Sequence, residues 1–164
     1  MRKTEYRRFS QIKRKYLTKF TKAKTKKQLD SLKGKFLESL VRLAFDRLHF
    51  EVRRHKNKTL DFLANNENFE LSIEVTNWKN EAYPHFEYVD SKLEAFEPLK
   101  TINLWIISYL EVLEIPEERI EELKESHNLH FIELGKDHDF QNTGYNDYLK
   151  VKGKIKEKLK ELKR

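Results

Sequence analysis

Cysteine is absent from this sequence of 164 residues, which also contains only four glycines and three prolines. The absence of cysteine excludes a disulfide scaffold, a thiolate metal site and a cysteine nucleophile. So few glycines could hardly build a glycine-rich phosphate-binding loop. No apolar run approaches the roughly 20 residues of a membrane span, and the N-terminus lacks the apolar core of a signal peptide. We therefore expect a single soluble domain in the cytoplasm, with no membrane partner.

Histidine and serine form no recognisable catalytic pattern. The six histidines show no H-x-x-x-H spacing, which a helical metal site would need. Ser72 has no histidine partner at a readable spacing, so the sequence does not predict Ser-His-Asp chemistry.

Positive charge is concentrated at the two ends of the chain. Residues 1–27 carry twelve Lys and Arg against Glu5 alone, and residues 150–164 carry eight against two glutamates. Because the whole chain has a net charge of +7, residues 28–149 have a net charge of −10. An acidic body with basic ends indicates a polyanionic partner, for which we expect a nucleic acid. The alternative is that the lysine-rich ends only keep the protein in solution.

The pattern of apolar residues predicts an α/β domain. We expect a mixed central sheet that begins with an antiparallel hairpin and is flanked by helices. The core comprises residues 28–144, and basic helices lie at both ends of the chain, in residues 1–27 and 145–164. The expected helices are residues 4–24, 28–49, 86–99, 116–126 and 145–163, and the expected strands are residues 50–54, 59–64, 69–76, 102–110 and 129–134. The aromatic residues of the first helix leave open that it packs onto the body.

The hairpin places two carboxylates on one face. Burying the alternating apolar residues of both strands on the same side fixes the parity of the register, because a slip of one residue turns a whole strand over. A two-residue turn at residues 67–68 puts Asp61 opposite Glu74, whereas a four-residue turn at 65–68 puts it diagonal to Glu74. Either turn brings the two Cβ atoms within roughly 5 to 8 Å.

Two neighbouring carboxylates repel each other and are costly to desolvate unless a proton or a cation lies between them. Oxygen ligands at this separation suit Mg²⁺. A third acid, Glu38, lies beside the apolar face of the second helix and could point at the pair. The alternative is that this face is open to water and that all three acids are ordinary surface residues.

These residues resemble a known group of nucleases. Glu38 on a helix, Asp61 after a basic loop and the stretch IEVT at residues 73–76 are similar to the motif of the PD-(D/E)xK superfamily, which has the restriction-endonuclease-like fold. The α-β-β-β-α-β order of residues 28–110 matches the core of that superfamily. Two shorter similarities are those of residues 33–38 (KGKFLE) to the first helix of archaeal Holliday-junction resolvases and of residues 73–79 (IEVTNWK) to nuclease-related (NERD) domains.

The resemblance implies a metal-dependent phosphodiesterase. Asp61 and Glu74 would hold Mg²⁺ or Mn²⁺, with the backbone carbonyl of Val75 as a further ligand and Glu38 as a supporting acid that binds the metal through water. The metal would lower the pKa of the attacking water and offset the charge on the scissile phosphate. A homodimer is also implied by the resemblance alone.

The chain departs from the motif at its lysine, because Thr76 occupies that position. Two lysines are candidates to supply the missing charge: Lys79, three residues further on, and Lys92, in the following helix. The candidates for nucleic-acid contact are cations of the basic N-terminal helix and of the basic loop before Asp61, together with one aromatic residue beside the site: Arg7, Arg8, Lys13, Arg14, Lys15, Lys56, Lys58 and Trp78.

Three functions therefore remain open from the sequence. The first is a metal-dependent endonuclease acting on DNA. The second is a nucleic-acid-binding protein that has a nuclease-like fold and has lost catalysis, with Thr76 as the mark of that loss. The third is a protein-interaction module whose basic ends are only solvated.

Overall fold

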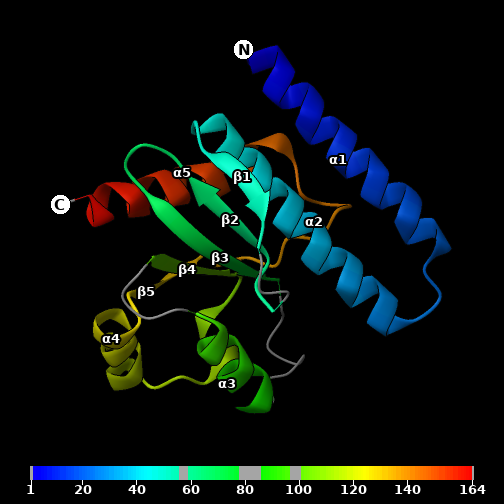
Figure 1. Cartoon of the computed structure of the whole chain (residues 1–164). Coiled ribbons are helices and arrows are strands. Elements are labelled where there is room, and N and C mark those ends of the chain that lie inside the picture. Colours follow the sequence, from blue (N-terminus) through cyan, green and yellow to red (C-terminus); the bar gives the residue numbers. More distant parts are fainter. Residues whose placement is uncertain (1, 56–58, 78–85, 97–100, 164) are drawn as a thin grey trace.

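The structure is a computed structural model, which describes residues 2–55, 59–77, 86–96 and 101–163. Five strands form one mixed sheet in the order β1-β2-β3-β4-β5, flanked by five helices (Figure 1). The strands are β1 (Glu51–Arg54), β2 (Phe62–Asn65), β3 (Glu70–Thr76), β4 (Ile102–Ile107) and β5 (Leu129–Glu133). The helices are α1 (Arg2–Lys22), α2 (Lys26–Arg47), α3 (Phe86–Ala95), α4 (Glu117–Ser126) and α5 (Tyr145–Leu162).

The sheet changes direction in the middle. Strands β1, β2 and β3 form an antiparallel meander, whereas β3, β4 and β5 run parallel to one another. Helices α3 and α4 provide the two connections between the parallel strands. The expected α/β class, the mixed sheet and the order of elements are therefore confirmed.

Both faces of the sheet are covered by helices. One face packs on α2 and α5, with Phe62, Ile73 and Leu104 fully buried among their apolar residues. The other face packs on α3 and α4 around Trp105 and Leu123. Burial on both sides explains why β4 is apolar along nearly its whole length, as strands of parallel sheets are.

The register of the hairpin follows the two-residue alternative. Phe62 pairs with Ile73 and Asn65 with Glu70, and continuing this register by one residue places Asp61 beside Glu74. The Asn66 side chain closes the turn by accepting the backbone N–H groups of Asn68 and Phe69, at 2.8 and 2.9 Å.

Several boundaries differ from the expected ones. Strand β2 begins at Phe62 rather than residue 59, and α3 ends at Ala95 rather than residue 99. Strand β4 ends at Ile107, and a short 3₁₀ helix that the sequence did not predict follows at Leu110–Leu113.

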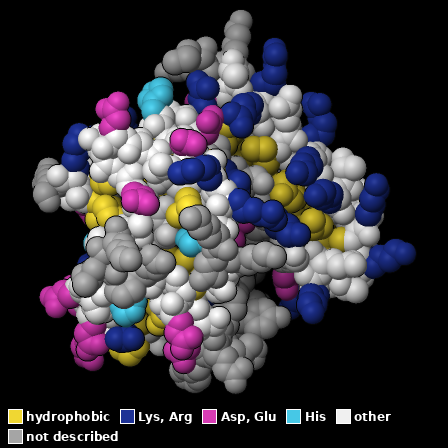
Figure 2. Space-filling model, viewed as in Figure 1, with side chains coloured by type: hydrophobic (Ala, Val, Ile, Leu, Met, Phe, Trp, Pro, Cys, Tyr) yellow, Lys and Arg dark blue, Asp and Glu magenta, His cyan; other side chains and the backbone are white. Residues whose placement is uncertain are grey.

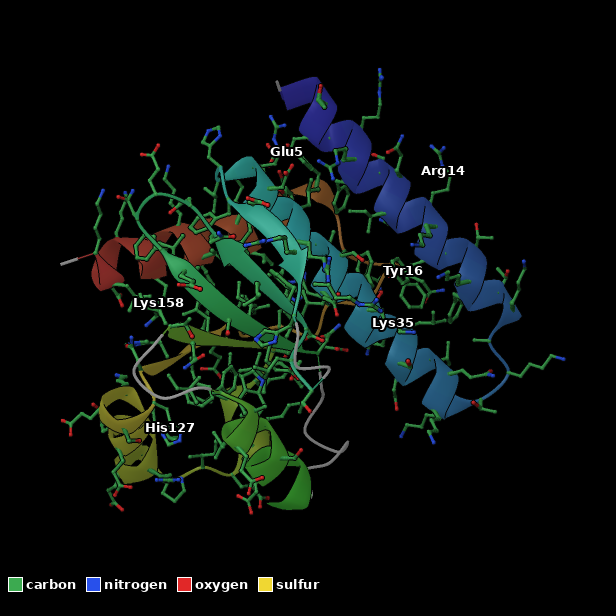
Figure 3. All side chains as sticks on the ribbon, viewed as in Figure 1. Glu5, Arg14, Tyr16, Lys35, His127 and Lys158 are labelled. Atoms are coloured by element: carbon green, nitrogen blue, oxygen red, sulfur yellow. The ribbon has the colours of Figure 1, made fainter. Side chains whose placement is uncertain are left out.

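The basic helix α1 is packed onto the body along one side. Phe9 and Tyr16 are buried in the same core as α2 and α5. Tyr16 points toward α2 (Figure 3), where its hydroxyl lies 3.2 Å from the Oγ of Ser39. Glu5 is also buried, and its Oε2 accepts hydrogen bonds from the Tyr148 hydroxyl (2.7 Å) and the Lys152 ammonium (2.9 Å). The aromatic stripe of this segment therefore serves packing, which is the alternative that its aromatic residues left open.

Charge is unevenly distributed over the surface. Lys and Arg side chains gather over α1 and α2, while the Asp and Glu side chains lie mainly over the rest of this face, including the region around α4 (Figure 2). The cations of α1 therefore form an exposed positive surface on the side that faces away from the core.

Candidate active site

Asp61 and Glu74 lie side by side at the end of the β2–β3 pairing where β2 begins. Asp61 directly precedes β2, and its Oδ2 accepts the backbone N–H of Val75 at 2.7 Å. The Asp61 N–H donates to the carbonyl of Ile73 at 3.1 Å, so backbone and side chain both fix this residue against β3. Glu74 lies on β3, on the face toward α3, with only 2 % of its surface exposed. Beyond the end of β2, the Val75 N–H of β3 thus bonds to the side chain of Asp61 instead of to a backbone carbonyl.

Glu38 reaches the same place from α2. The Nε of Arg42, one turn further along the helix, lies 2.9 Å from Glu38 Oε2. The same guanidinium donates to the backbone carbonyl of Asp61 at 3.4 Å and lies over the ring of Phe62, 5.0 Å from its centroid. Arg42 therefore joins α2 to the start of β2 and holds Glu38 beside Asp61. Arg42 was not predicted from the sequence, although its spacing of four from Glu38 was a signal that could have found it.

Among the described residues, Lys92 is a lysine that contacts the Glu74 carboxylate. Its ammonium lies 2.8 Å from Glu74 Oε2 and also donates to the backbone carbonyl of Thr59. Both partners of the ion pair are largely buried, with 13 % of the Lys92 side chain and 2 % of the Glu74 side chain exposed. Lys79, the other candidate, lies outside the described residues.

Thr76 occupies the position of the motif lysine but contributes no charge. Its hydroxyl accepts a hydrogen bond from the indole N–H of Trp105 at 2.9 Å, and the residue is 3 % exposed. The contact anchors β3 to the neighbouring strand β4. Any positive charge beside Glu74 must therefore come from another element, which α3 supplies with Lys92.

Two of the three acids, Glu38 and Asp61, have raised pKa values. Burial raises the pKa of Glu38 to about 7, and the negative charge of Asp61 adds to the effect. Burial likewise raises the pKa of Asp61 to about 7, with the charge of Glu74 as the next cause. Near neutral pH the cluster therefore holds protons that ordinary surface carboxyls would have released, and a bound cation would displace them.

This proton uptake predicts a pH-dependent stability without divalent metal. The unfolded chain releases these protons at the ordinary pKa values of 4.5 and 3.8, while the folded protein keeps them to about 7. The folded state thus binds more protons between these values, and the free energy of unfolding should fall as the pH rises from about 4 to 7. The Asp61→Asn variant should show a smaller fall in thermal midpoint between pH 5 and pH 8 than the wild type.

The test compares the variant with the wild type, and does not use the wild-type profile alone, because other groups titrate in the same pH range. Burial lowers the pKa of His130 and of His138, which makes stability rise with pH as these rings lose their protons. The Glu70→Gln variant is a matched control, since Glu70 is an exposed acid on β3. An Asp61→Asn profile identical to those of the wild type and Glu70→Gln would contradict the shared-proton interpretation.

The donor set suits a hard divalent cation. Within the described residues, no three His, Asp or Glu side chains are gathered closely enough to form a ready-made metal centre. Mg²⁺ does not require one, because it usually takes one or two carboxylates and keeps several waters or substrate oxygens. Asp61 and Glu74 provide such a pair of oxygen donors, and the mutual repulsion that raises the pKa of Asp61 is what a cation would relieve.

The expected nucleic-acid contacts are divided. Arg7, Arg14 and Lys15 are exposed on α1, and Lys13 is partly exposed. Arg8 is also exposed, and its guanidinium lies 2.8 Å from the carboxylate of Asp46 on α2. The other residues expected to contact nucleic acid lie outside the described part of the chain: Lys56, Lys58 and Trp78.

The polar contacts of two residues near the site, Ser72 and Asn77, were not predicted. The Nε2 of His55 lies 3.0 Å from the Oγ of Ser72, although no histidine partner was expected for this serine. Ser72 is 5 % exposed, so the contact satisfies a buried hydroxyl rather than presenting a nucleophile. Asn77, directly after β3, accepts hydrogen bonds from the Ser108 hydroxyl (2.7 Å) and the His138 N–H (3.1 Å) and donates to the carbonyl of Lys33 (3.2 Å).

Comparison of the chain with protein-family models, with curated proteins and with solved structures gives no match. Across the described ranges, no helix combines the length and apolar character needed to cross a bilayer. The class that the fold defines is therefore an α/β protein with a five-stranded mixed sheet flanked by five helices.

Proposed function

We propose that this protein is a metal-dependent endonuclease that hydrolyses phosphodiester bonds in DNA, on a core like that of the PD-(D/E)xK nucleases. The observation that carries the proposal is a series of neighbouring charged side chains from four separate parts of the chain: Glu38 lies beside Asp61, Asp61 beside Glu74, and Glu74 pairs with Lys92. The order α2-β1-β2-β3-α3-β4 gives further support, because the superfamily core has the same succession of elements.

Each residue has a defined task in this proposal. Asp61 and Glu74 would hold Mg²⁺, together with the carbonyl of Val75, and Glu38 would bind it through water. Bound Mg²⁺ supplies a water of lowered pKa and offsets charge on the phosphate. Arg42 keeps Glu38 in place through the 2.9 Å ion pair. Lys92 orients the Glu74 carboxylate and brings a positive charge next to the metal ligands.

The charge distribution supports a nucleic acid as the substrate. Helix α1 carries nine Lys and Arg and one acid, Glu5, which is buried and paired with Lys152. The exposed charged side chains described on α1 are therefore all Lys or Arg, which favours contact with phosphate (Figure 2). The acidic site and the basic surface lie on different elements, so that metal binding and phosphate binding do not compete for the same side chains.

A nicking assay tests the proposal. Supercoiled plasmid incubated with the wild-type protein and Mg²⁺ or Mn²⁺ should be converted to the open-circular form, and EDTA should stop the conversion. Linear, branched and single-stranded DNA and RNA form the rest of the substrate panel. If no substrate is cut with either metal, the endonuclease function is rejected.

One observation favours a second candidate, a nucleic-acid-binding protein without catalysis. The hydrogen bond between Trp105 and Thr76 fills the position of the motif lysine with a buried structural contact. In that case DNA should bind with a strong salt dependence while remaining intact in Mg²⁺. The nicking assay and a binding titration at several salt concentrations separate the two functions.

A further inference from the structure

A groove with mixed aromatic and basic walls lies between α1 and the start of α5. It has a volume of about 380 Å³ and opens to solvent. Tyr6, Phe9 and Tyr145 supply aromatic rings to its walls, while Lys13 and Arg14 supply positive charge. This groove is formed by elements other than those that carry Asp61 and Glu74.

The aromatic wall is a series of rings in mutual contact that ends at the surface. Tyr148 is fully buried, and its hydroxyl donates to Glu5. Tyr145 stacks on Tyr148 with ring centroids 5.7 Å apart, and Tyr6 meets Tyr145 edge-on at 5.1 Å. A ring held in this way loses little conformational freedom when a ligand binds to it.

Tyr6 is the most exposed large hydrophobic side chain in the part of the chain that the structure describes, with 55 % of its surface accessible. The inner stripe of α1 uses its aromatic residues for packing, as Phe9 and Tyr16 show, with 4 % exposure each. Tyr6 departs from this pattern, since about half of the residue remains in contact with water. An exposed aromatic on a rigid support is the usual feature of a stacking platform.

The charge around the ring is complementary to phosphate. Arg14 projects from the outer side of α1, away from the core (Figure 3), and Lys13 lines the same groove. The acid of α1, Glu5, is neutralised in the interior by Lys152 at 2.9 Å. A ligand in this groove therefore meets cations and an aromatic face together, which suits a phosphodiester chain with accessible bases.

We propose that the α1/α5 groove binds single-stranded nucleic acid, with one unpaired base on the ring of Tyr6 and the adjoining phosphates on Lys13 and Arg14. A duplex cannot use this platform in the same way, because its base faces are already stacked on one another. The inference rests on the proposed function and narrows it, since it specifies a substrate with unpaired bases, such as a single strand or a branched junction.

The experiment measures binding in EDTA, so that cleavage plays no part. The probes are a fluorescein-labelled single-stranded DNA oligonucleotide and the corresponding duplex, followed by anisotropy. Loss of one base–aromatic stack is worth about 1–3 kcal/mol, so Tyr6→Ala should weaken single-strand binding by about 5- to 150-fold. Duplex affinity should not change. Tyr6→Phe, which keeps the ring, is the matched control and should bind the single strand like wild type.

Two further variants make the test specific. Tyr6→Leu keeps apolar bulk without an aromatic face and should lose single-strand affinity as Tyr6→Ala does. The double variant Lys13→Gln/Arg14→Gln should flatten the slope of log affinity against log salt by about 0.7 per lost phosphate contact on single strands.

The proposal is overturned if Tyr6→Ala and Tyr6→Leu bind the single strand as wild type does, or if they weaken duplex binding equally. An unchanged salt slope for the double variant would overturn it too. Because the binding assay contains no metal, its result does not depend on whether the protein nicks DNA. Base stacking without nicking would thus reject the nuclease, whereas nicking without base stacking would reject the groove as its substrate site.

Discussion

The Glu74→Gln variant should lose Mg²⁺-dependent nicking by at least about 10²–10³-fold. Glutamine keeps the shape of the side chain but removes the negative charge that a divalent cation requires. Asp61→Asn should have a similar effect, while the amide oxygen can still accept the N–H of Val75 that now bonds to Asp61 at 2.7 Å. DNA affinity should stay level or rise in both variants, because a negative charge near the phosphate is removed. Initial nicking rates and Mg²⁺ titrations by calorimetry measure the two effects.

Glu70→Gln is the control for this pair. Glu70 lies on the same strand as Glu74 but is exposed at the far end of β3, so its loss should leave both the nicking rate and the Mg²⁺ titration unchanged. Circular dichroism must show the same fold in every variant. Robust cleavage by both Glu74→Gln and Asp61→Asn would mean that the metal is held elsewhere.

The fold was predictable because it follows from local patterns. The period of the apolar residues indicated the order of helices and strands, and the parity of the hairpin was enough to bring Asp61 and Glu74 together. The hairpin register was one of two alternatives, and it is decided by the Asn66 turn, whose side chain accepts two backbone N–H groups.

The remaining parts of the site depend on contacts between distant residues. The Thr76 hydroxyl accepts a hydrogen bond from the indole of Trp105, 29 residues away, and the Asn77 side chain accepts one from the backbone of His138, 61 residues away. Neither pairing leaves a spacing signal in the chain, because each depends on how β4 and the segment after β5 pack. The choice between Lys79 and Lys92 has the same origin, since only the packing of α3 on the sheet brings Lys92 to Glu74.

The behaviour of the basic helix was also undecided from the sequence. Its cations indicated a phosphate-binding arm, while its aromatic residues indicated packing. The structure places the two properties on different sides of α1, with Tyr16 toward α2 and Arg14 toward solvent (Figure 3). Deleting this helix would therefore uncover the core, and substitutions of single cations are the better probe of nucleic-acid binding.

Lys92→Gln is the second variant for which we expect a large effect. Its ammonium is held between the Glu74 carboxylate at 2.8 Å and the carbonyl of Thr59, so it has the fixed position that electrostatic stabilisation requires. Removing one such group typically costs about 10²–10³ in rate, which we expect for nicking by this variant. Lys124→Gln is the control, because Lys124 is an exposed lysine on α4 that pairs with Glu121.

Metal affinity separates a role in charge stabilisation from one in structure alone. Lys92 competes with a cation for Glu74, so its loss should leave Mg²⁺ affinity level or raise it while the rate falls. A purely structural role would instead lower both together, since a disordered Glu74 could no longer bind metal. Lys92→Arg keeps the charge and should retain more activity than Lys92→Gln. If Lys92→Gln cuts at the wild-type rate and Lys79→Ala does not, the motif lysine has been replaced by Lys79, and the buried ion pair on Glu74 serves only the packing of α3.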